Sequence, residues 1–348
     1  MLLKELSEAV GVSGQESAVR QLILPAIEGH AADIRIDPLG NVTAIQRGTG
    51  GGLRVMLAAH MDEIGFMVTG FDGDGLVRFT AVGGVDERIL PGLRVRLGDQ
   101  AVAGVVIWAP IHKTAGQNSA VQIKNLRIDI GASSKDEAQG RVKLGDRVAF
   151  EGRFLELSPN MVRGKAFDDR VGCALLVDIV QGGPYACDVL AAFTVQEEIG
   201  LRGARVAARI LKPEVALALE GTTANDIPDP LADPDEEVEP NPACRLGAGP
   251  ALTLMDRSLI ADPRLLAFLR RTAEAEGIPY QLKTALGGGT DAGAIHLTNS
   301  GVPSAVISVP CRYIHSPAAL LNRDDYAHTL RLVQASLNRL TPDALRRD

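Results

Sequence analysis

The run Leu53-Arg54-Val55-Met56-Leu57-Ala58-Ala59 is followed directly by His60-Met61-Asp62-Glu63. The length and composition of the apolar run are typical of a buried β-strand. In open α/β sheets, ligands bind beyond the carboxyl ends of the strands. The histidine and the acidic residues after Ala59 therefore stand where such a fold places a functional site.

A second region with this pattern begins near residue 158, where apolar strand-like runs alternate with helical patterns. We expect strands at Val189–Val195, Val215–Leu219 and Ser304–Val309. We expect helices at Asp169–Val180, Gly203–Ile210, Asp262–Glu276, Ala292–Asn299 and Asp324–Arg339. Near the N-terminus, Ser13 and Glu16 have the spacing of a capping box that would open a further helix.

Residues from about 67 to 157 have a different character. Short alternating runs are separated by Gly/Asp turns, which is typical of a small all-β barrel or sandwich. Within this region, Gly104 weakens one strand and indicates a bulge. The predicted fold class is α/β, with a central mixed sheet flanked by helices and an inserted β-barrel or sandwich domain. The expected boundaries are 1–66 and 158–348 for the α/β domain and 67–157 for the insertion.

The composition argues against several classes of protein. The 348 residues carry a formal charge of −7 without clusters of Lys and Arg, which argues against nucleic acid as a partner. No apolar stretch is long enough to span a bilayer, and we expect neither a membrane partner nor a secretory signal. The four cysteines lie far apart, so we expect buried thiols in a reducing cytoplasm.

Potential metal ligands stand where four of the expected strands end. They are His60 after the first strand, Glu197 and Glu198 after the second, Glu220 after the third and His315 beyond the fourth. Asp168 and Asp169 form a further pair of carboxylates where a loop meets a helix. Imidazoles and carboxylates that converge on one sheet edge suit a pair of divalent cations.

This ligand set predicts hydrolytic chemistry. Two cations that share a bridging carboxylate lower the pKa of a trapped water, and the proton then needs a base that is not itself a ligand. The adjacent Glu197 and Glu198 suit this division of tasks, and Asp62 could accept the second N–H of His60 and orient its ring. Each residue taken singly has an ordinary explanation, such as a loop histidine, surface charge or a helix cap. Their joint occurrence is what indicates a site.

Five segments in order resemble the glutamyl/tetrahedral (deblocking) aminopeptidases, a cytoplasmic family of dinuclear metallopeptidases also labelled cellulase-M-like or endoglucanase-like. The segments are Ala59–Phe66, Lys165–Arg170, Gln196–Gly200, Glu220–Asp226 and Arg312–Pro317. The resemblance covers nearly the whole chain and implies a zinc-peptidase-like fold. It also implies a peptide substrate and two divalent metal ions per subunit, zinc or cobalt.

The resemblance implies a role for each candidate residue. Asp168, rather than Asp169, would bridge the metals. His60 and Glu220 would complete one metal site, and Glu198 and His315 the other. Glu197 would be the general base, with Asp62 orienting His60. The resemblance is imperfect at Glu220, where many members of the family carry Asp.

Two further features follow from the resemblance. Gly288, Gly289 and Thr290 are candidates for substrate binding, and the alternative is a glycine-rich turn with Asp291 capping the next helix. The inserted β domain would be a dimerisation domain, so we expect a homo-oligomer built from dimers, up to a dodecamer.

The leading functional hypothesis is a metal-dependent aminopeptidase that removes N-terminal residues from peptides. A metal-dependent deacylase of small amides would use the same ligands. A glycoside hydrolase could use the paired carboxylates, but it leaves both histidines unexplained. A non-catalytic assembly protein with a vestigial site is a fourth possibility. The sequence does not fix the preferred N-terminal residue, which depends on pocket loops that could include a neighbouring subunit's loop near His112–Asn118. The Pro/Asp-rich stretch Ile227–Pro250 could reshape the entrance to the site.

Overall fold

The structure is a computed structural model that describes residues 2–50, 52–109, 121–227, 244–284 and 287–346. Within these ranges the α/β part is built on one mixed sheet of 11 strands. Its order is β1-β2-β12-β3-β13-β16-β17-β11-β10, with β14 and β15 attached beside β16. The strands are β1 (Ala32–Ile36), β2 (Val42–Gln46), β3 (Arg54–His60), β10 (Leu155–Glu156), β11 (Met161–Gly164), β12 (Asp188–Thr194), β13 (Val215–Thr223), β14 (Ala251–Thr253), β15 (Gln281–Lys283), β16 (Ser304–Arg312) and β17 (Ala319–Asn322).

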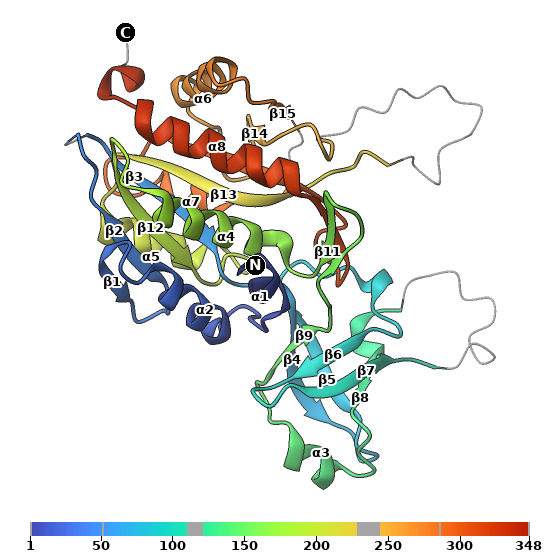
Figure 1. The fold of residues 1–348 in the computed structure, drawn as a ribbon. Helices are drawn as coiled ribbons and strands as arrows, with labels where there is room; N and C mark the ends of the chain where they lie inside the picture. Colours follow the sequence, from blue (N-terminus) through green and yellow to red (C-terminus); the bar gives the residue numbers. More distant parts are fainter. Residues whose placement is uncertain (1, 51, 110–120, 228–243, 285–286, 347–348) are drawn as a thin grey trace, which may run out of the picture.

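Helices cover both faces of this sheet (Figure 1). They are α1 (Leu2–Glu8), α2 (Ser17–Ile27), α4 (Phe167–Gly182), α5 (Arg202–Leu211), α6 (Pro263–Ala275), α7 (Asp291–Ile295) and α8 (Arg323–Arg339). Successive residues of a strand point to opposite faces. On β3, Val55 and Leu57 pack with α1, α2, α4, α6 and α8, whereas Met56 and Ala58 pack with α5 and α7. Burial on both faces explains the nearly continuous apolar run of this strand.

The centre of the sheet is parallel. Strand β3 pairs in parallel with β12 on one side and β13 on the other, and β13 pairs in parallel with β16. The carboxyl ends of these four strands therefore meet at one edge of the sheet. Strand β13 runs to Thr223 and β16 to Arg312, so both are longer than predicted. Glu220 consequently lies within β13 and not beyond its end.

The inserted region forms a closed barrel with the order β4-β5-β8-β7-β6-β9, which lies beside the sheet in Figure 1. Its strands are β4 (Gly65–Phe71), β5 (Val77–Val82), β6 (Arg94–Leu97), β7 (Val102–Ile107), β8 (Arg127–Asp129) and β9 (Arg147–Phe150). The barrel has its own core, in which Phe66 makes edge-to-face contacts with Phe79 and Phe150. The predicted combination of a mixed α/β sheet with an inserted barrel is confirmed.

Two details of the insertion differ from the sequence prediction. The region also contains a helix, α3 (Lys135–Arg141), because Ser134 caps its N-terminus by accepting a hydrogen bond from the Glu137 N–H. Gly104 forms no bulge, since β6 and β7 pair in continuous register through it. A Cβ at this position would lie 2.7 Å from Ile128. The glycine therefore makes room for barrel packing.

Other segment predictions were partly wrong. Helix α1 was not predicted, and α7 ends at Ile295, short of the expected Asn299.

All four cysteines are buried and free, as expected. Among the described residues, no helix combines the length and the apolar character needed to cross a membrane.

Candidate metal centre

The predicted ligands form one cluster at the carboxyl edge of the parallel strands. His60 ends β3, Glu197 and Glu198 follow β12, Glu220 lies in β13, His315 follows β16, and Asp168 lies at the start of α4. The register pairs Thr194 of β12 directly with His60. Because β12 and β13 flank β3, the residues near their carboxyl ends come to lie around His60. The structure thus brings all six predicted ligand and base residues together.

Asp168 lies between the two imidazoles. Its Oδ1 is 3.1 Å from Nε2 of His60, and its Oδ2 is 3.3 Å from Nε2 of His315. Asp168 and Asp169 have non-helical backbone angles within the first turn of α4, so the start of the helix is irregular. Burial by itself would raise the pKa of Asp168, but hydrogen bonds and the charge of both imidazoles hold it well below its ordinary value.

Asp169, the alternative that the sequence left open, points elsewhere. Its Oδ1 accepts a hydrogen bond from the Gly172 N–H, and its Oδ2 accepts one from the His60 N–H, both at 3.0 Å. Asp169 is near enough to His60 and Glu220 to share an ion with them. However, both of its oxygens already bind backbone amides, whereas Asp168 faces the two imidazoles. We therefore favour Asp168 as the residue that would face metal.

The three glutamates complete the cluster from two sides. Nε2 of His60 lies 3.7 Å from Oε2 of Glu220 and 3.9 Å from Oε2 of Glu197. Nε2 of His315 lies 3.3 Å from Oε1 of Glu198. Burial raises the pKa of Glu197, Glu198 and Glu220 above the ordinary glutamate value. Three carboxyl groups therefore lie close together in a buried environment that disfavours their ionised form.

The pKa values of the two imidazoles are also raised, which favours their charged form. Burial by itself would lower the pKa of both histidines. The surrounding carboxylates, Glu197 and Asp168 above all, raise the pKa of His60 well above its ordinary value. Asp168 and Glu198 raise the pKa of His315 to about 11. The carboxylates therefore favour the protonated form of both imidazoles.

The cluster fits divalent metal ions. Oε1 of Glu220 is buried and makes no hydrogen bond with any described residue. Buried polar atoms normally have a partner, so an unsatisfied carboxylate oxygen beside two imidazoles and three further carboxylates indicates a cation site. Single ligand atoms of His60, Asp168 and Glu198 lie within 4.8 Å of one another. Imidazole nitrogen and carboxylate oxygen are suitable donors for zinc and related ions.

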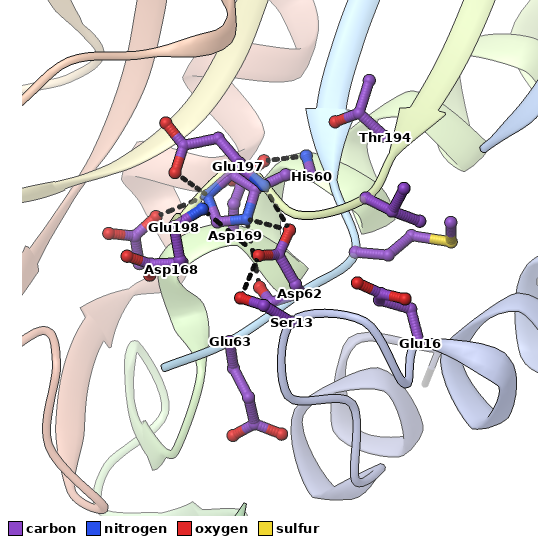
Figure 2. A network of polar contacts seen from close by, with 12 residues as sticks. Ser13, Glu16, His60, Asp62, Glu63, Asp168, Asp169, Thr194, Glu197 and Glu198 are labelled. Atoms are coloured by element: carbon purple, nitrogen blue, oxygen red, sulfur yellow. Dashed lines mark hydrogen bonds and ion pairs between the residues drawn. The ribbon is translucent and has the colours of Figure 1, made fainter. Parts of the chain in front are cut away.

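Asp62 holds the loop that carries the two adjacent glutamates (Figure 2). Its Oδ1 accepts a hydrogen bond from the Glu197 N–H at 3.0 Å, and its Oδ2 accepts one from the Glu198 N–H at 3.2 Å. Nδ1 of His60 lies 3.0 Å from the backbone oxygen of Asp62 and 3.5 Å from its Oδ1. The backbone carbonyl, more than the predicted carboxylate, is thus the partner that orients the imidazole.

Ser13 contributes to this network, and its role was not predicted. Its hydroxyl donates to Oδ2 of Asp62 at 2.6 Å, and its backbone oxygen accepts a hydrogen bond from Nε of Arg147 in the barrel strand β9. The predicted capping box is wrong, because the N-cap of α2 is Glu16 and makes no side-chain capping bond. Ser13 therefore links the barrel to Asp62 and does not start a helix. The sequence gives no signal for this contact, because Ser13 and Asp62 are 49 residues apart. The spacing of Ser13 to Glu16 indicated a capping box instead.

A buried ionic cluster supports the segment after β3. Nζ of Lys165 contacts both carboxylate oxygens of Glu63, at 2.6 and 2.8 Å. The guanidinium of Arg170 donates to the backbone oxygens of Met61 and Leu6. Burial lowers the pKa of Lys165 to about 8, although the charge of Glu63 opposes this change. These contacts tie α1, the end of β3 and the start of α4 together beneath the candidate centre.

A cavity of about 1070 Å³ opens over the cluster, and the predicted residues Gly288, Gly289 and Thr290 line it. The Thr290 hydroxyl donates to Oδ2 of Asp256, and the Thr290 N–H donates to Oγ of Ser258, both at 3.3 Å. The segment is thus held against a neighbouring turn. The loop His112–Asn118 and residues 228–243 of the Pro/Asp-rich stretch lie outside the described residues.

Asp291 does not cap α7, because the N-cap is Thr290. Asp291 is buried and accepts a hydrogen bond from the Thr194 hydroxyl at 2.5 Å. Burial raises the pKa of Asp291 to about 6, although the charge of His60 and the bond from Thr194 oppose this change. The sequence signal was misleading, because an acidic residue at a helix start usually indicates a cap.

Comparison with known proteins shows the family to which this chain belongs. The model of the M42 glutamyl aminopeptidase family matches residues 40–332. The chain belongs to the M42 glutamyl aminopeptidase family. This M42 chain is therefore a hydrolase of the aminopeptidase class, in a family whose members depend on metal. The predicted family, fold class and enzyme class are confirmed.

Relatives match the M42 chain over almost its whole length. A putative aminopeptidase of Acetivibrio thermocellus is 39% identical, covering 95% of this chain and 96% of its own. A lysyl aminopeptidase of Pyrococcus furiosus is 34% identical, with coverage of 98% and 97%. The crystal structure of a TET aminopeptidase from a marine sediment thaumarchaeon has a TM-score of 0.92 at 36% identity, covering 99% and 98%. The dodecameric PhTET1 structure has a TM-score of 0.84 at 32% identity, covering 97% and 98%.

Proposed function

We propose that the cluster around Asp168 binds two divalent metal ions, zinc or cobalt, and hydrolyses the first peptide bond of peptides. The observation that carries the proposal is the position of Asp168. One of its carboxylate oxygens faces His60 and the other faces His315. A carboxylate with each oxygen directed at a separate imidazole has the arrangement that a shared ligand between two ions requires.

The other proposed ligands fall into two groups, one on each side of Asp168. His60 and Glu220 would complete the first metal site, since Glu220 faces His60. Glu198 and His315 would complete the second, since they face each other. The side chain of Glu220 is long enough to bring Oε2 within 3.7 Å of Nε2 of His60.

Glu197 would act as the general base. When bound, two divalent ions would lower the pKa of the attacking water and polarise the scissile carbonyl group. Glu197 is buried, and its raised pKa suits a group that must both take and return a proton. It would accept a proton from the water as the C–O bond forms. It would return that proton to the nitrogen of the leaving amine as the C–N bond breaks. Asp62 would fix this base by binding its backbone N–H.

The remaining elements support substrate binding and assembly. Gly288, Gly289 and Thr290 would hold the peptide, because they line the cavity above the cluster. We place the inserted domain over the barrel strands, residues 65–150, close to the expected 67–157, because β10 (Leu155–Glu156) pairs within the large sheet; the α/β domain takes the rest of the chain. The insertion would form the dimer contact of a cytoplasmic homo-oligomer, up to the dodecamer seen for PhTET1.

Metal removal and restoration tests this function. Three substrates are compared: a peptide with a free N-terminus, the same peptide N-acetylated, and a soluble β-glucan. We expect cleavage of the free peptide alone, loss of that activity on chelation, and recovery on addition of zinc or cobalt. Glu197→Gln should lower kcat by roughly 10²- to 10⁴-fold. The matched control is Glu28→Gln, at an exposed position.

The outcomes separate the alternatives. Peptide cleavage that persists after full metal removal would contradict the metal mechanism. Faster cleavage of N-acetylated substrates would support the deacylase, and metal-independent release of sugar would support the glycoside hydrolase. A fully active Glu197→Gln protein would show that the base is another residue.

A further inference from the structure

Helix α7 brings a buried carboxyl group to the face of the sheet on which His60 lies. Ala58 of β3 and Ala192 of β12 pack with α5 and α7. Side chains two residues apart on a strand point to the same face, so those of His60 and Thr194 also face these helices. The register pairs His60 directly with Thr194, at the carboxyl ends of neighbouring strands (Figure 2). Asp291 is the first residue of α7, and it contacts this pair through Thr194.

Two hydrogen bonds join Asp291 to the segment that follows His60. Its Oδ2 accepts a hydrogen bond from the hydroxyl of Thr194. The backbone oxygen of Thr194 in turn accepts one from the Met61 N–H at 2.8 Å. The Asp291 side chain is fully buried and is not among the residues that line the cavity. Asp291 therefore lies behind the centre, outside the proposed set of ligands.

One oxygen of Asp291 has no hydrogen-bond donor. Its Oδ1 is buried and makes no hydrogen bond with any described residue. The buried Asp62 and Asp169 differ, since each uses both of its oxygens to bind backbone amides. No Lys or Arg among the described residues pairs with Asp291. A buried carboxylate without such partners destabilises a fold, so folding alone does not explain this one.

The charge of Asp291 acts on the candidate centre. Burial raises the pKa of Asp291 to about 6, so the carboxyl group is ionised at neutral pH. The charge of His60 favours this ionised form. Burial raises the pKa of Glu197 most, and the charge of Asp291 raises it more than that of the adjacent Glu198 does. Because buried charges are weakly screened, a cation held beside His60 is attracted by the same carboxylate.

We propose that Asp291 strengthens the binding of the metal ion on the His60 side, although it is not itself a ligand. This inference rests on the proposed metal centre, because the cation that balances Asp291 is the one that His60 and Glu220 would hold. Without metal, the Asp291 carboxylate is buried near other acidic groups and lowers the stability of the fold. With metal, its charge attracts the ion. Asp291 thus makes the metal-free protein less stable and raises its affinity for metal.

The test separates the charge of Asp291 from its shape. Asp291→Asn keeps the size of the side chain and an oxygen that can accept from Thr194, but it removes the charge. Asp325→Asn is the matched control, because Asp325 is also fully buried but binds the N–H groups of Gly247 and Gly249 with its two oxygens. Each protein is stripped of metal, and its thermal unfolding is recorded. Zinc is then titrated in competition with a chelator, at a pH above the pKa of Asp291.

The two substitutions should have opposite effects. The ion on the His60 side should be the more tightly bound one, because His60 is buried whereas His315 is partly exposed. In Asp291→Asn, the affinity for this zinc should fall by about tenfold, the lower end of what outer contacts of a metal site contribute. The metal-free form of this variant should unfold at the wild-type temperature or above it. Asp325→Asn should unfold at a lower temperature and keep the wild-type zinc affinity.

Three results would overturn the role of Asp291 and leave the aminopeptidase function in place. The first is an Asp291→Asn protein with the zinc affinity of the wild type. The second is a metal-free Asp291→Asn protein that unfolds at a lower temperature or does not fold, which would indicate a structural role. The third is an equal loss of zinc affinity in Asp325→Asn. A wild-type protein that binds no zinc would instead overturn the proposed function.

Discussion

The two imidazoles of the candidate centre lie in different surroundings. The His60 side chain is 2% exposed and ends a strand in the middle of the sheet, where the backbone oxygen of Asp62 binds its Nδ1. The His315 side chain is 33% exposed and follows β16 in a loop. Its Nδ1 lies 3.0 Å from the backbone oxygen of Gly84, which belongs to the inserted region.

This difference shows that the two halves of the centre depend on different parts of the molecule. The core of the α/β sheet builds the His60 half, whereas the His315 half also depends on the contact between the sheet and the barrel. A metal ion on the His315 side should therefore dissociate more readily. Asp168 faces both imidazoles, so it should be the residue to which metal binding is most sensitive.

The largest effect is expected for Asp168→Asn. The amide cannot provide two anionic oxygens, so binding at both positions should weaken. We expect kcat/KM to fall by roughly 10³-fold, about 4 kcal/mol of transition-state stabilisation. Metal content by mass spectrometry should fall toward zero. An Asp168→Asn protein that keeps two metals per chain would exclude Asp168 as the shared ligand.

A direct comparison of the histidines comes next. His315→Ala should retain one metal and regain part of its activity in excess zinc or cobalt, because the buried half of the centre remains intact. His60→Ala should lose activity at every metal concentration and also unfold at a lower temperature. Metal titration by calorimetry and thermal unfolding would measure both effects. Equal metal loss in the two variants would contradict the proposed difference between the halves.

A smaller effect is expected for Ser13→Ala. The change removes the hydroxyl that binds Oδ2 of Asp62, so the loop with Glu197 and Glu198 loses part of its support. Outer contacts of this kind typically contribute 10- to 100-fold, and we expect kcat to fall by about tenfold. The KM value and the thermal midpoint should change little, and Ser13→Thr should restore kcat. A loss that Ser13→Thr fails to rescue would indicate a packing role.

The smallest effect is a pH dependence of metal binding. The surrounding carboxylates raise the pKa of His60 and raise the pKa of His315 to about 11, which favours protonated imidazoles in the metal-free protein. Metal binding must release the protons that its ligands carry. The metal-free form therefore binds more protons than the loaded form, so affinity should increase with pH. Calorimetry in buffers of different ionisation enthalpy measures the release, and binding without proton release would contradict it.

Much of the fold could be predicted because its strands are buried on both faces. Such strands appear as apolar runs in the sequence, and polar residues beyond their ends indicate the site. His60, Glu197 and His315 were found in this way. The barrel could be predicted from its short alternating strands and turns.

The missed features depend on contacts between distant segments. Ser13 binds Asp62, which is 49 residues away, and its local spacing to Glu16 indicated a capping box instead. The choice between Asp168 and Asp169 depended on the hydrogen bonds that occupy Asp169. None of these contacts produces a pattern in the sequence.

The most direct test is anomalous diffraction from crystals of the protein loaded with zinc. Two metal peaks on either side of the Asp168 carboxylate are expected, with His60 and Glu220 beside one, and Glu198 and His315 beside the other. The peak on the His315 side should be the first to disappear when zinc is depleted. A single peak, or a pair of ions that Asp168 does not contact, would contradict the shared-ligand arrangement.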